Sequence, residues 1–261
     1  MDDQTVRRYL DRIGAPEPGE PTIEVLRDLH LRHLRTVPFE NLSIHLGEPI
    51  VLDEAALVDK IIGRRRGGFC YELNGLFAGL LRALGYRVSM LSARVHTPDG
   101  VFTHPFDHLA LRVDLAERYL VDVGFGTHSS YPLRLDWPEA QADPGGEFLV
   151  VDAPDGDVDV LKDGEPQYRM ESRPRELADF GPTCWWQQTS PESNFAKSVA
   201  CSRLTPEGRL TLAGDRLITT VAGERTESTI SGDDALLDAY RTHFGFTLDR
   251  LPIDPKSAVV A

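Results

Sequence analysis

The spacing of the apolar residues changes at Gly85, and this change constrains the fold more than any other feature of the sequence. Before Gly85, apolar residues recur at helical spacing, which predicts helices over residues 3–13, 22–37, 53–62 and 70–84. After Gly85, apolar and polar residues alternate between Asp-Gly and Pro-Asp-Gly turns, which indicates antiparallel strands. The chain is therefore predicted to be an α+β protein, with a helical first part followed by a small antiparallel barrel or sandwich.

The same patterns predict where the elements begin and end. Thr22 and Asp53 are expected N-caps, because their side-chain oxygens accept hydrogen bonds from backbone N–H groups of the first helical turn. A final helix is expected from about Asp233, a third N-cap, to His243. Strands are predicted over residues 86–95, 107–115, 118–123, 148–151, 158–161, 167–170, 198–204, 209–212, 216–221 and 225–230.

Composition and charge narrow the classes of function. The 261 residues are 41% hydrophobic and 26% charged, which is ordinary for a soluble globular protein. The net charge of −13 disfavours a nucleic acid or an anionic membrane as the main partner. The acidic N-terminal residues are followed by no apolar targeting segment, and no apolar run is long enough to span a bilayer, so we expect a cytoplasmic protein.

Neither a disulfide framework nor a metal site is expected. The three cysteines are widely spaced and form no C-x-x-C pair. The eight histidines show no ligand pattern; His30 and His33 share a helix face without further ligands and are expected at the surface. We therefore expect no metal cofactor.

Cys70 is the first candidate catalytic residue, because Gly67 and Gly68 deliver it to the start of an apolar helix. Unpaired backbone N–H groups and the helix dipole favour a thiolate at this position, and the thiolate is the reactive form. The glycines also permit a tight turn and leave room for a substrate. The alternative is a small buried core residue, because a lone cysteine is weak evidence for a nucleophile.

Three consecutive arginines, Arg64 to Arg66, precede this turn in an otherwise acidic chain. One interpretation is a solvated patch that positions the loop before Cys70. A more specific one pairs one arginine with an internal carboxylate, such as Glu40, while another faces an anionic substrate.

A cysteine nucleophile needs a base, and the base needs an orienting acceptor. His108 lies near the start of a predicted strand, and Asp122 is a carboxylate at the end of an otherwise apolar strand. Two adjacent antiparallel strands would bring them side by side, so that Asp122 holds the imidazole of His108. Alternatively, His108 is an exposed strand residue and the backbone N–H groups of residues 124–126 satisfy Asp122.

Other nucleotide-binding and hydrolase motifs are absent from the sequence. No G-x-x-x-x-G-K-[ST] loop and no G-x-S-x-G elbow occur, and Gly124-Phe125-Gly126 is too short for a dinucleotide fingerprint. That turn still offers a place where a phosphate or pantetheine group approaches the backbone.

Taken together, these segments resemble the arylamine N-acetyltransferase family. The matching pieces occur in family order and span most of the chain, and their combination is far more specific than any one of them. They are Arg35-Thr36-Val37-Pro38-Phe39-Glu40-Asn41-Leu42, Arg66-Gly67-Gly68-Phe69-Cys70-Tyr71-Glu72-Leu73-Asn74, Asp107-His108-Leu109-Ala110-Leu111, Val121-Asp122-Val123-Gly124-Phe125-Gly126 and Ser190-Pro191-Glu192-Ser193-Asn194-Phe195.

The resemblance implies a cysteine-protease-like triad with Cys70 as nucleophile, His108 as base and Asp122 as orienting acid. It also implies three regions: a helical bundle over residues 1–85, a β-barrel over residues 86–195, and an α/β lid over residues 196–261. Acetyl-CoA would donate an acetyl group to Cys70, and an arylamine, arylhydrazine or arylhydroxylamine would then accept it.

Contacts to both substrates, the aromatic amine and the CoA thioester, are predicted from the sequence. Tyr71, Phe125 and Phe195 are predicted as apolar walls for an aromatic amine. For the CoA thioester, the predicted contacts are Gly124, Gly126 and Thr127. Many family members have a further glycine after the Gly-Phe-Gly turn, where this chain has Thr127, so the donor-binding loop departs from the family pattern.

Three other functions remain open from sequence alone. An amide synthase would transfer an acyl chain from a carrier protein to Cys70 and release it as a macrolactam. A cysteine hydrolase would use the same triad with water as acceptor. A binding protein would retain the fold without an activated thiol. The natural amine, the preferred acyl donor and the oligomeric state do not follow from the sequence.

Overall fold

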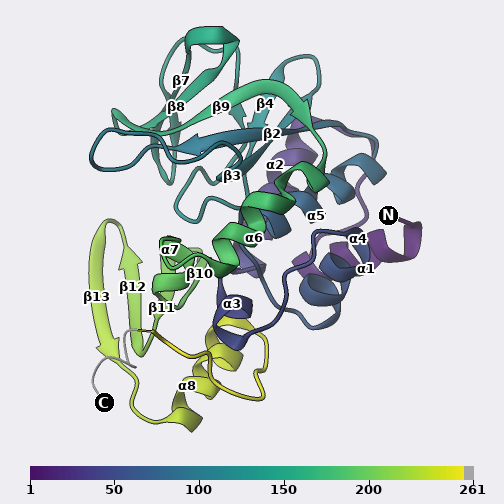
Figure 1. Ribbon diagram of the computed structural model, residues 1–261. Helices are drawn as coiled ribbons and strands as arrows, with labels where there is room; N and C mark the ends of the chain where they lie inside the picture. Colours follow the sequence, from purple (N-terminus) through teal and green to yellow (C-terminus); the bar gives the residue numbers. More distant parts are fainter. Residues whose placement is uncertain (256–261) are drawn as a thin grey trace.

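The computed structural model describes residues 1–255, and its first part is helical, as predicted (Figure 1). The Thr22 hydroxyl accepts a hydrogen bond from the Val25 N–H at 3.3 Å, and the Asp53 carboxylate accepts one from the Ala56 N–H at 2.8 Å, so both predicted N-caps are confirmed. The helices are α1 (Asp3–Ile13), α2 (Ile23–Thr36), α3 (Leu42–Leu46), α4 (Glu54–Leu57), which continues as a π-helical segment (Val58–Gly63), and α5 (Cys70–Ala83).

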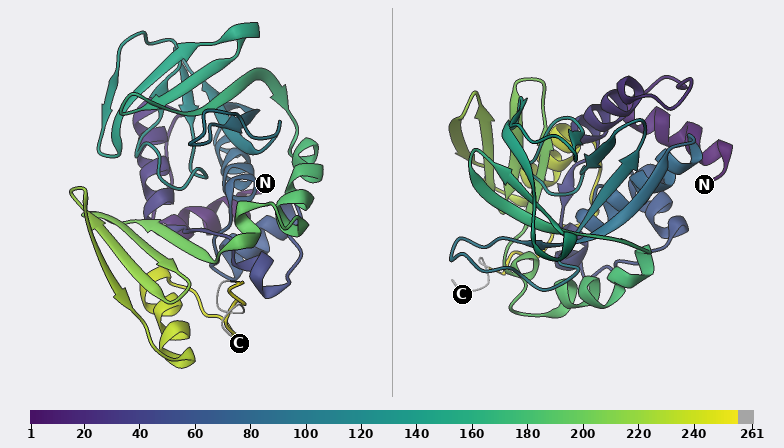
Figure 2. Two further views of the ribbon diagram at one scale, coloured as in Figure 1. Left: turned by 60° about the vertical axis from the view of Figure 1, so that its left-hand side comes forward. Right: turned by 90° about the horizontal axis from the view of Figure 1, so that it is seen from above.

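Helix α5 lies in the interior of the protein. From Cys70 to Leu81 every residue except Gly79 is buried, because the helix presents apolar side chains on nearly all sides. It packs against α1 and α4 and against strands β2 and β3 of the large sheet. Figure 2 shows the N-terminal helices against one side of that sheet. The first residue of α5 is therefore held between the helices and the strands.

The large sheet is an antiparallel, nearly closed barrel with the strand order β5-β4-β3-β2-β9-β8-β7-β6. Its end strands β5 and β6 are joined by the side chain of Gln141, which accepts from the Arg134 N–H at 2.8 Å and donates to the Arg134 carbonyl at 3.0 Å. The strands are β2 (Arg87–Val95), β3 (His108–Asp114), β4 (Arg118–Val121), β5 (Leu133–Arg134), β6 (Gln141–Asp143), β7 (Gly146–Asp152), β8 (Val158–Lys162) and β9 (Glu165–Arg175).

A second, five-stranded antiparallel sheet follows, and its edge strand comes from the N-terminal part of the chain. That edge strand is β1 (Phe39–Glu40), which pairs with β10. The other strands are β10 (Ala200–Leu204), β11 (Gly208–Ala213), β12 (Arg216–Val221) and β13 (Glu224–Thr229). Helix α8 (Asp233–Ala239) continues as a π-helical segment (Tyr240–Phe244), and its N-cap is Gly232, one residue before the predicted Asp233.

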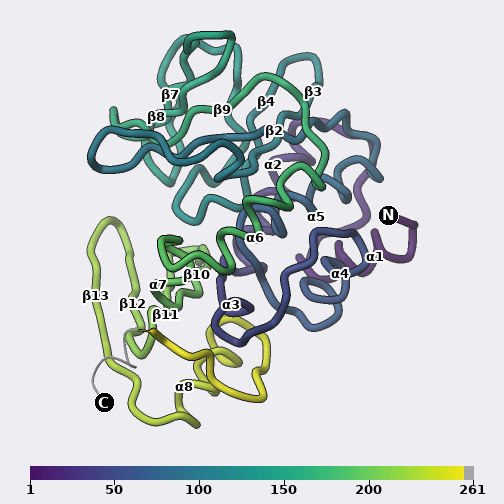
Figure 3. The backbone as a smooth tube through the Cα atoms, in the orientation of Figure 1, coloured from purple at the N-terminus to yellow at the C-terminus, as the bar shows by residue number. Residues whose placement is uncertain are grey.

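Two short helices connect the sheets. α6 (Gly181–Thr189) and α7 (Asn194–Lys197) lie between the barrel and the second sheet in Figure 1, in a stretch for which the sequence predicted no helix. Figure 3 shows the C-terminal segment returning to α3, where the Ile253 N–H donates to the His45 carbonyl at 3.0 Å. Helix α3 therefore touches segments from both halves of the chain.

The predicted α+β architecture, with N-terminal helices, an antiparallel barrel and a C-terminal sheet and helix, is confirmed. Region boundaries at residues 85 and 195 stay a prediction. The surface placement of His30 and His33 is wrong, because both side chains are fully buried. The ring of His33 packs against Tyr9 and Phe77, so apolar neighbours enclose it.

Within residues 1–255, no helix combines the length and the apolar character needed to cross a membrane.

The turn before α5 requires glycine at position 67. An added Cβ there would lie 1.8 Å from the Pro38 carbonyl oxygen, so Gly67→Ala forces two backbone segments apart. We expect this substitution to lower the free energy of unfolding by at least about 2 kcal/mol.

Gly79→Ala in α5 is the matched control, measured in the same urea titration. A Cβ at Gly79 meets only the ends of two side chains, Met1 at 3.4 Å and Glu54 at 3.9 Å. Its unfolding free energy is expected to stay level or rise by up to about 1 kcal/mol, because alanine favours helix. Equal losses in both variants would contradict the packing argument.

Candidate active site

Cys70 is the first residue of α5, as the sequence predicted, and its backbone is enclosed on two sides. The Glu72 carboxylate accepts a hydrogen bond from the Phe69 N–H at 3.2 Å, which caps the helix directly before the cysteine. On the other side, a Cβ added at Gly124 would lie 2.7 Å from the Cys70 Cα. Only glycine lets the 124–126 turn approach the cysteine this closely.

Burial opposes the predicted effect of the helix terminus on the thiol. Cys70 is only 3% exposed, and burial raises its pKa well above the ordinary value, with Asp107 and Asp122 adding to the rise. A hydrogen bond from the Leu109 backbone acts in the opposite direction. A lone thiolate is therefore disfavoured here, and a thiolate at Cys70 requires a neighbouring positive charge.

His108 and Asp122 lie side by side, as predicted from their strands. The register of β3 and β4, with Leu111 opposite Val121, brings the start of one strand next to the end of the other. The His108 Nε2 atom lies 2.7 Å from the Asp122 Oδ2 atom, and both side chains are buried. Because Nε2 is hydrogen-bonded to the carboxylate, Nδ1 is the nitrogen that can accept a proton from a group in the cavity.

The Asp122 carboxylate accepts four hydrogen bonds. Oδ2 accepts from His108 and, at 3.0 Å, from the Tyr168 hydroxyl. Oδ1 accepts from the Asn74 amide and from the Gly124 N–H, each at 2.9 Å. Burial alone raises the pKa of Asp122, but His108 and these donors outweigh it and hold that pKa well below its usual value. Asp122 is therefore ionised at neutral pH.

Sequence reasoning missed Asn74 and Tyr168 as partners of Asp122, and it missed the position of His128 beside Tyr168. The Asn74 amide also donates to the Leu109 carbonyl at 2.6 Å and accepts from the Val123 N–H at 2.9 Å, so it links α5 to both strands of the site. His128 Nε2 lies 3.4 Å from the Tyr168 hydroxyl, and burial lowers the pKa of His128 to about 4. Asn74 lies one helical turn after Cys70, a position from which its proximity was foreseeable, whereas Tyr168 and His128 carry no local signal.

Cys70 and His108 line one cavity of about 670 Å³. Phe125 and Phe195, both predicted as apolar walls, line it as well. Tyr71 lies outside this lining; it is fully buried, and its hydroxyl donates to the Phe106 and Asp107 carbonyls at 2.7 and 3.0 Å.

Only part of the predicted donor-binding turn, residues 124–127, lines the cavity. Gly124 lines the cavity, whereas Gly126 and Thr127 lie outside the lining. Gly126 has a φ of +88°, a left-handed conformation that favours glycine, and Thr127 is exposed.

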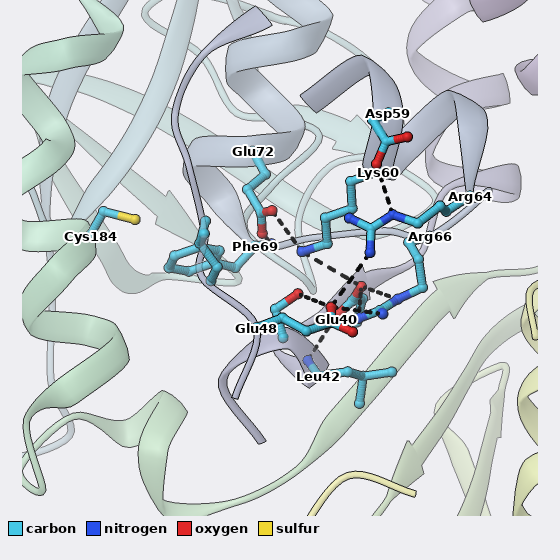
Figure 4. A network of polar contacts seen from close by, with 12 residues as sticks. Glu40, Leu42, Glu48, Asp59, Lys60, Arg64, Arg66, Phe69, Glu72 and Cys184 are labelled. Atoms are coloured by element: carbon cyan, nitrogen blue, oxygen red, sulfur yellow. Dashed lines mark hydrogen bonds and ion pairs between the residues drawn. The ribbon is translucent and has the colours of Figure 1, made fainter. Parts of the chain in front are cut away.

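A buried cluster of charges fixes the segment before Cys70 (Figure 4). Lys60 Nζ lies 2.6 Å from Glu72 and 3.9 Å from Glu40, and Arg66 Nη2 lies 2.9 Å from Glu40. All four side chains are almost completely buried, and their charges balance. The interpretation that one arginine of the run 64–66 pairs with Glu40 is thus confirmed for Arg66.

Among residues 1–255, no group of three or more His, Cys, Asp or Glu side chains is arranged to hold a metal ion.

Removing one charge of the cluster leaves another unpaired inside the protein. We expect Lys60→Met to lower the free energy of unfolding by about 3 to 5 kcal/mol, because Glu72 loses its counter-charge in a buried place. Arg216→Met is the control, since Arg216 forms an exposed ion pair with Glu227, and it should change stability by less than about 1 kcal/mol. Urea unfolding measures the free energy of unfolding of both variants. Similar losses would show that the buried charges contribute no more to stability than an exposed ion pair.

Comparisons with known proteins find relatives over almost the whole chain. A family model described as N-acetyltransferase matches residues 22–253. The arylamine N-acetyltransferase of Mycobacterium tuberculosis (strain H37Rv) is 35% identical over 251 residues, which cover 92% of this chain and 88% of that protein.

Solved structures agree. The arylamine N-acetyltransferase of Salmonella typhimurium has a TM-score of 0.88 and 30% identity to this protein, over 100% of this chain and 98% of its own. The Mycobacterium marinum arylamine N-acetyltransferase, solved in complex with CoA, has a TM-score of 0.84 and 33% identity, over 92% of each chain. On this evidence, the chain is an enzyme of the arylamine N-acetyltransferase family.

Proposed function

We propose that this protein transfers an acetyl group from acetyl-CoA to arylamines, arylhydrazines or arylhydroxylamines in two half-reactions, through an acetyl-cysteine at Cys70. The observation that carries the proposal is that Cys70 and His108 line one cavity while Asp122 holds His108 from behind at 2.7 Å. Membership of the family and a relative solved with CoA support the choice of donor.

In the first half-reaction, His108 takes the proton of the Cys70 thiol. Because burial disfavours a lone thiolate, the two residues react as a thiolate–imidazolium pair, and the ionised Asp122 stabilises the imidazolium. The sulfur attacks the thioester carbonyl, and the bond to the CoA sulfur then breaks. His108 returns the proton to the leaving CoA thiolate, which departs as free CoA.

In the second half-reaction, the nitrogen of the acceptor attacks the acetyl carbon on Cys70. His108 accepts the proton that the nitrogen loses, and the Cys70 thiolate leaves, which restores the starting ion pair. Backbone N–H groups at the start of α5 are assigned to stabilise the developing oxyanion in both steps. N–H groups in the first turn of a helix have no acceptor within the helix and point out of its end.

Aromatic acceptors fit the walls of the cavity. Phe125 and Phe195 are assigned to contact the ring of the amine, while Tyr71 acts from outside by holding the backbone at residues 106 and 107. Gly124 is assigned to the approach of the thioester, with Gly126 and Thr127 further along the same turn. A cytoplasmic location is part of the proposal, since the three cysteines are free and a reducing compartment keeps them so.

Intact-protein mass spectrometry tests the two half-reactions separately. Brief exposure to acetyl-CoA should add one acetyl group to the protein, and aniline added afterwards should remove it and yield acetanilide. Cys70→Ala should gain no acetyl group. Rapid alkylation of Cys70 without acetyl transfer would instead favour the amide synthase, and loss of the acetyl group without amine would favour the hydrolase.

The wall assignment predicts a separate effect on the acceptor. Phe125→Ala should raise the KM for aniline by about tenfold, because the ring loses an apolar surface on one side. The rate at which acetyl-CoA acetylates Cys70, measured in a single turnover, serves as the internal control and should change far less. An unchanged aniline KM would remove Phe125 from the acceptor site.

A further inference from the structure

Asp107 places a carboxylate at the wall of the reaction cavity, directly before His108 in the chain. Its backbone carbonyl lies 3.9 Å from the Cys70 sulfur. Asp107 is also one of the groups that raise the pKa of Cys70. Its carbonyl accepts a hydrogen bond from Tyr71, but the acetyl transfer described above assigns no role to its carboxylate.

The carboxylate of Asp107 is held in one orientation. The Gln187 amide of α6 donates to Asp107 Oδ1, and the Thr103 hydroxyl forms a second hydrogen bond to the side chain. Gln187 is itself fixed by the buried Ser193 hydroxyl, which donates to it at 2.6 Å. Burial raises the pKa of Asp107 above its ordinary value, although Thr103, His108, His104 and Gln187 act in the opposite direction. The ionised carboxylate offers about four acceptor sites, so acceptor capacity remains after these two bonds.

The cavity lining holds two carboxylates and three histidines, His96, His104 and His108. Asp107 and Glu192 both line it, and neither lysine nor arginine occurs among the described residues that do so. Glu192 is exposed, whereas Asp107 is partly buried and its backbone carbonyl contacts the Cys70 sulfur. A carboxylate on an acceptor would be repelled close to Cys70, and a cation or an N–H donor would be attracted. The donor escapes this repulsion because an uncharged pantetheine arm separates the CoA thioester from its phosphates.

We propose that Asp107 determines acceptor specificity, favouring aromatic amines with a positive charge or a second hydrogen-bond donor near the reacting nitrogen and disfavouring those with a carboxylate there. This inference rests on the proposed acetyl transfer and adds the chemical class of the acceptor. The amine is bound by its ring between apolar walls and by its polar group at Asp107.

The test compares three acceptors of similar size: meta-(aminomethyl)aniline, which carries a protonated side group, meta-toluidine, which is neutral, and meta-aminobenzoate, which is an anion. The wild-type enzyme should prefer them in that order by kcat/KM, and the para isomers should be measured beside them. In Asp107→Asn, which keeps the shape of the side chain, the ratio of cation to anion should fall by at least about tenfold.

Glu192→Gln is the matched control, because it removes the same charge from an exposed position of the same cavity. It should change the ratio by less than about threefold, since solvent and salt screen an exposed charge. An unchanged ratio in Asp107→Asn, or an equal change in Glu192→Gln, would overturn the inference. Thermal unfolding of both variants excludes a difference in folding.

Two further measurements separate this inference from the proposed function. Acetylation of Cys70 by acetyl-CoA involves no amine, so its failure in the wild type would overturn the acetyl transfer. Binding of the same amines to Cys70→Ala, followed by the fluorescence of Trp186 in the cavity wall, needs no reaction. If Asp107→Asn in that background leaves the relative affinities of cation and anion unchanged, the specificity role of Asp107 is wrong whatever the activity.

Discussion

The negative charge of Asp122, buried within the protein, is the constraint on which the rest of the site depends. A buried carboxylate without donors costs several kcal/mol, so the folded state requires all of its hydrogen bonds. These come from α5 through Asn74, from β3 through His108, from the turn after β4 through Gly124, and from β9 through Tyr168. The packing of the barrel on the helical region and the arrangement of the site therefore depend on the same hydrogen bonds.

A second set of buried charges fixes the other approach to Cys70. Lys60 and Glu72 join the π-helical segment to the first turn of α5, and Arg66 and Glu40 join the loop before that turn to β1. Glu72 takes part in two interactions: one oxygen pairs with Lys60, and the other accepts a hydrogen bond from the Phe69 N–H and so caps the helix. The position of the sulfur is thus set by charge pairing as well as by apolar packing.

Local patterns predicted much of this structure because they depend on neighbours in the chain. The N-caps Thr22 and Asp53 and most of the long strands follow from residue type and alternation. Tyr168 lies 46 residues from Asp122, and no local pattern distinguishes it from an ordinary core tyrosine. The sequence predicts His33 at the surface because no further ligand residues accompany it on its helix face, whereas the fold encloses it among aromatic rings.

The placement of His108 and Asp122 was predicted for a different reason. In an antiparallel pair, the start of one strand lies beside the end of the other. The sequence left the depth of Cys70 open, because burial depends on every element that covers α5. That depth opposes the expected effect of the helix end on the thiol, so the proposed mechanism relies on His108 to stabilise the thiolate. The glycine-rich turns, by contrast, were informative from sequence, since backbone contact leaves no room for a side chain.

The proposed reacting groups and the cavity walls belong to different kinds of structure. Cys70, His108 and Asp122 lie on α5, on β3 and directly after β4, whereas much of the wall comes from the 96–107 loop and from the α6–α7 segment. Loops accept insertions and substitutions more readily than the elements that they connect. Substitutions in those two segments would therefore change which amines fit the proposed site while Cys70, His108 and Asp122 keep their positions.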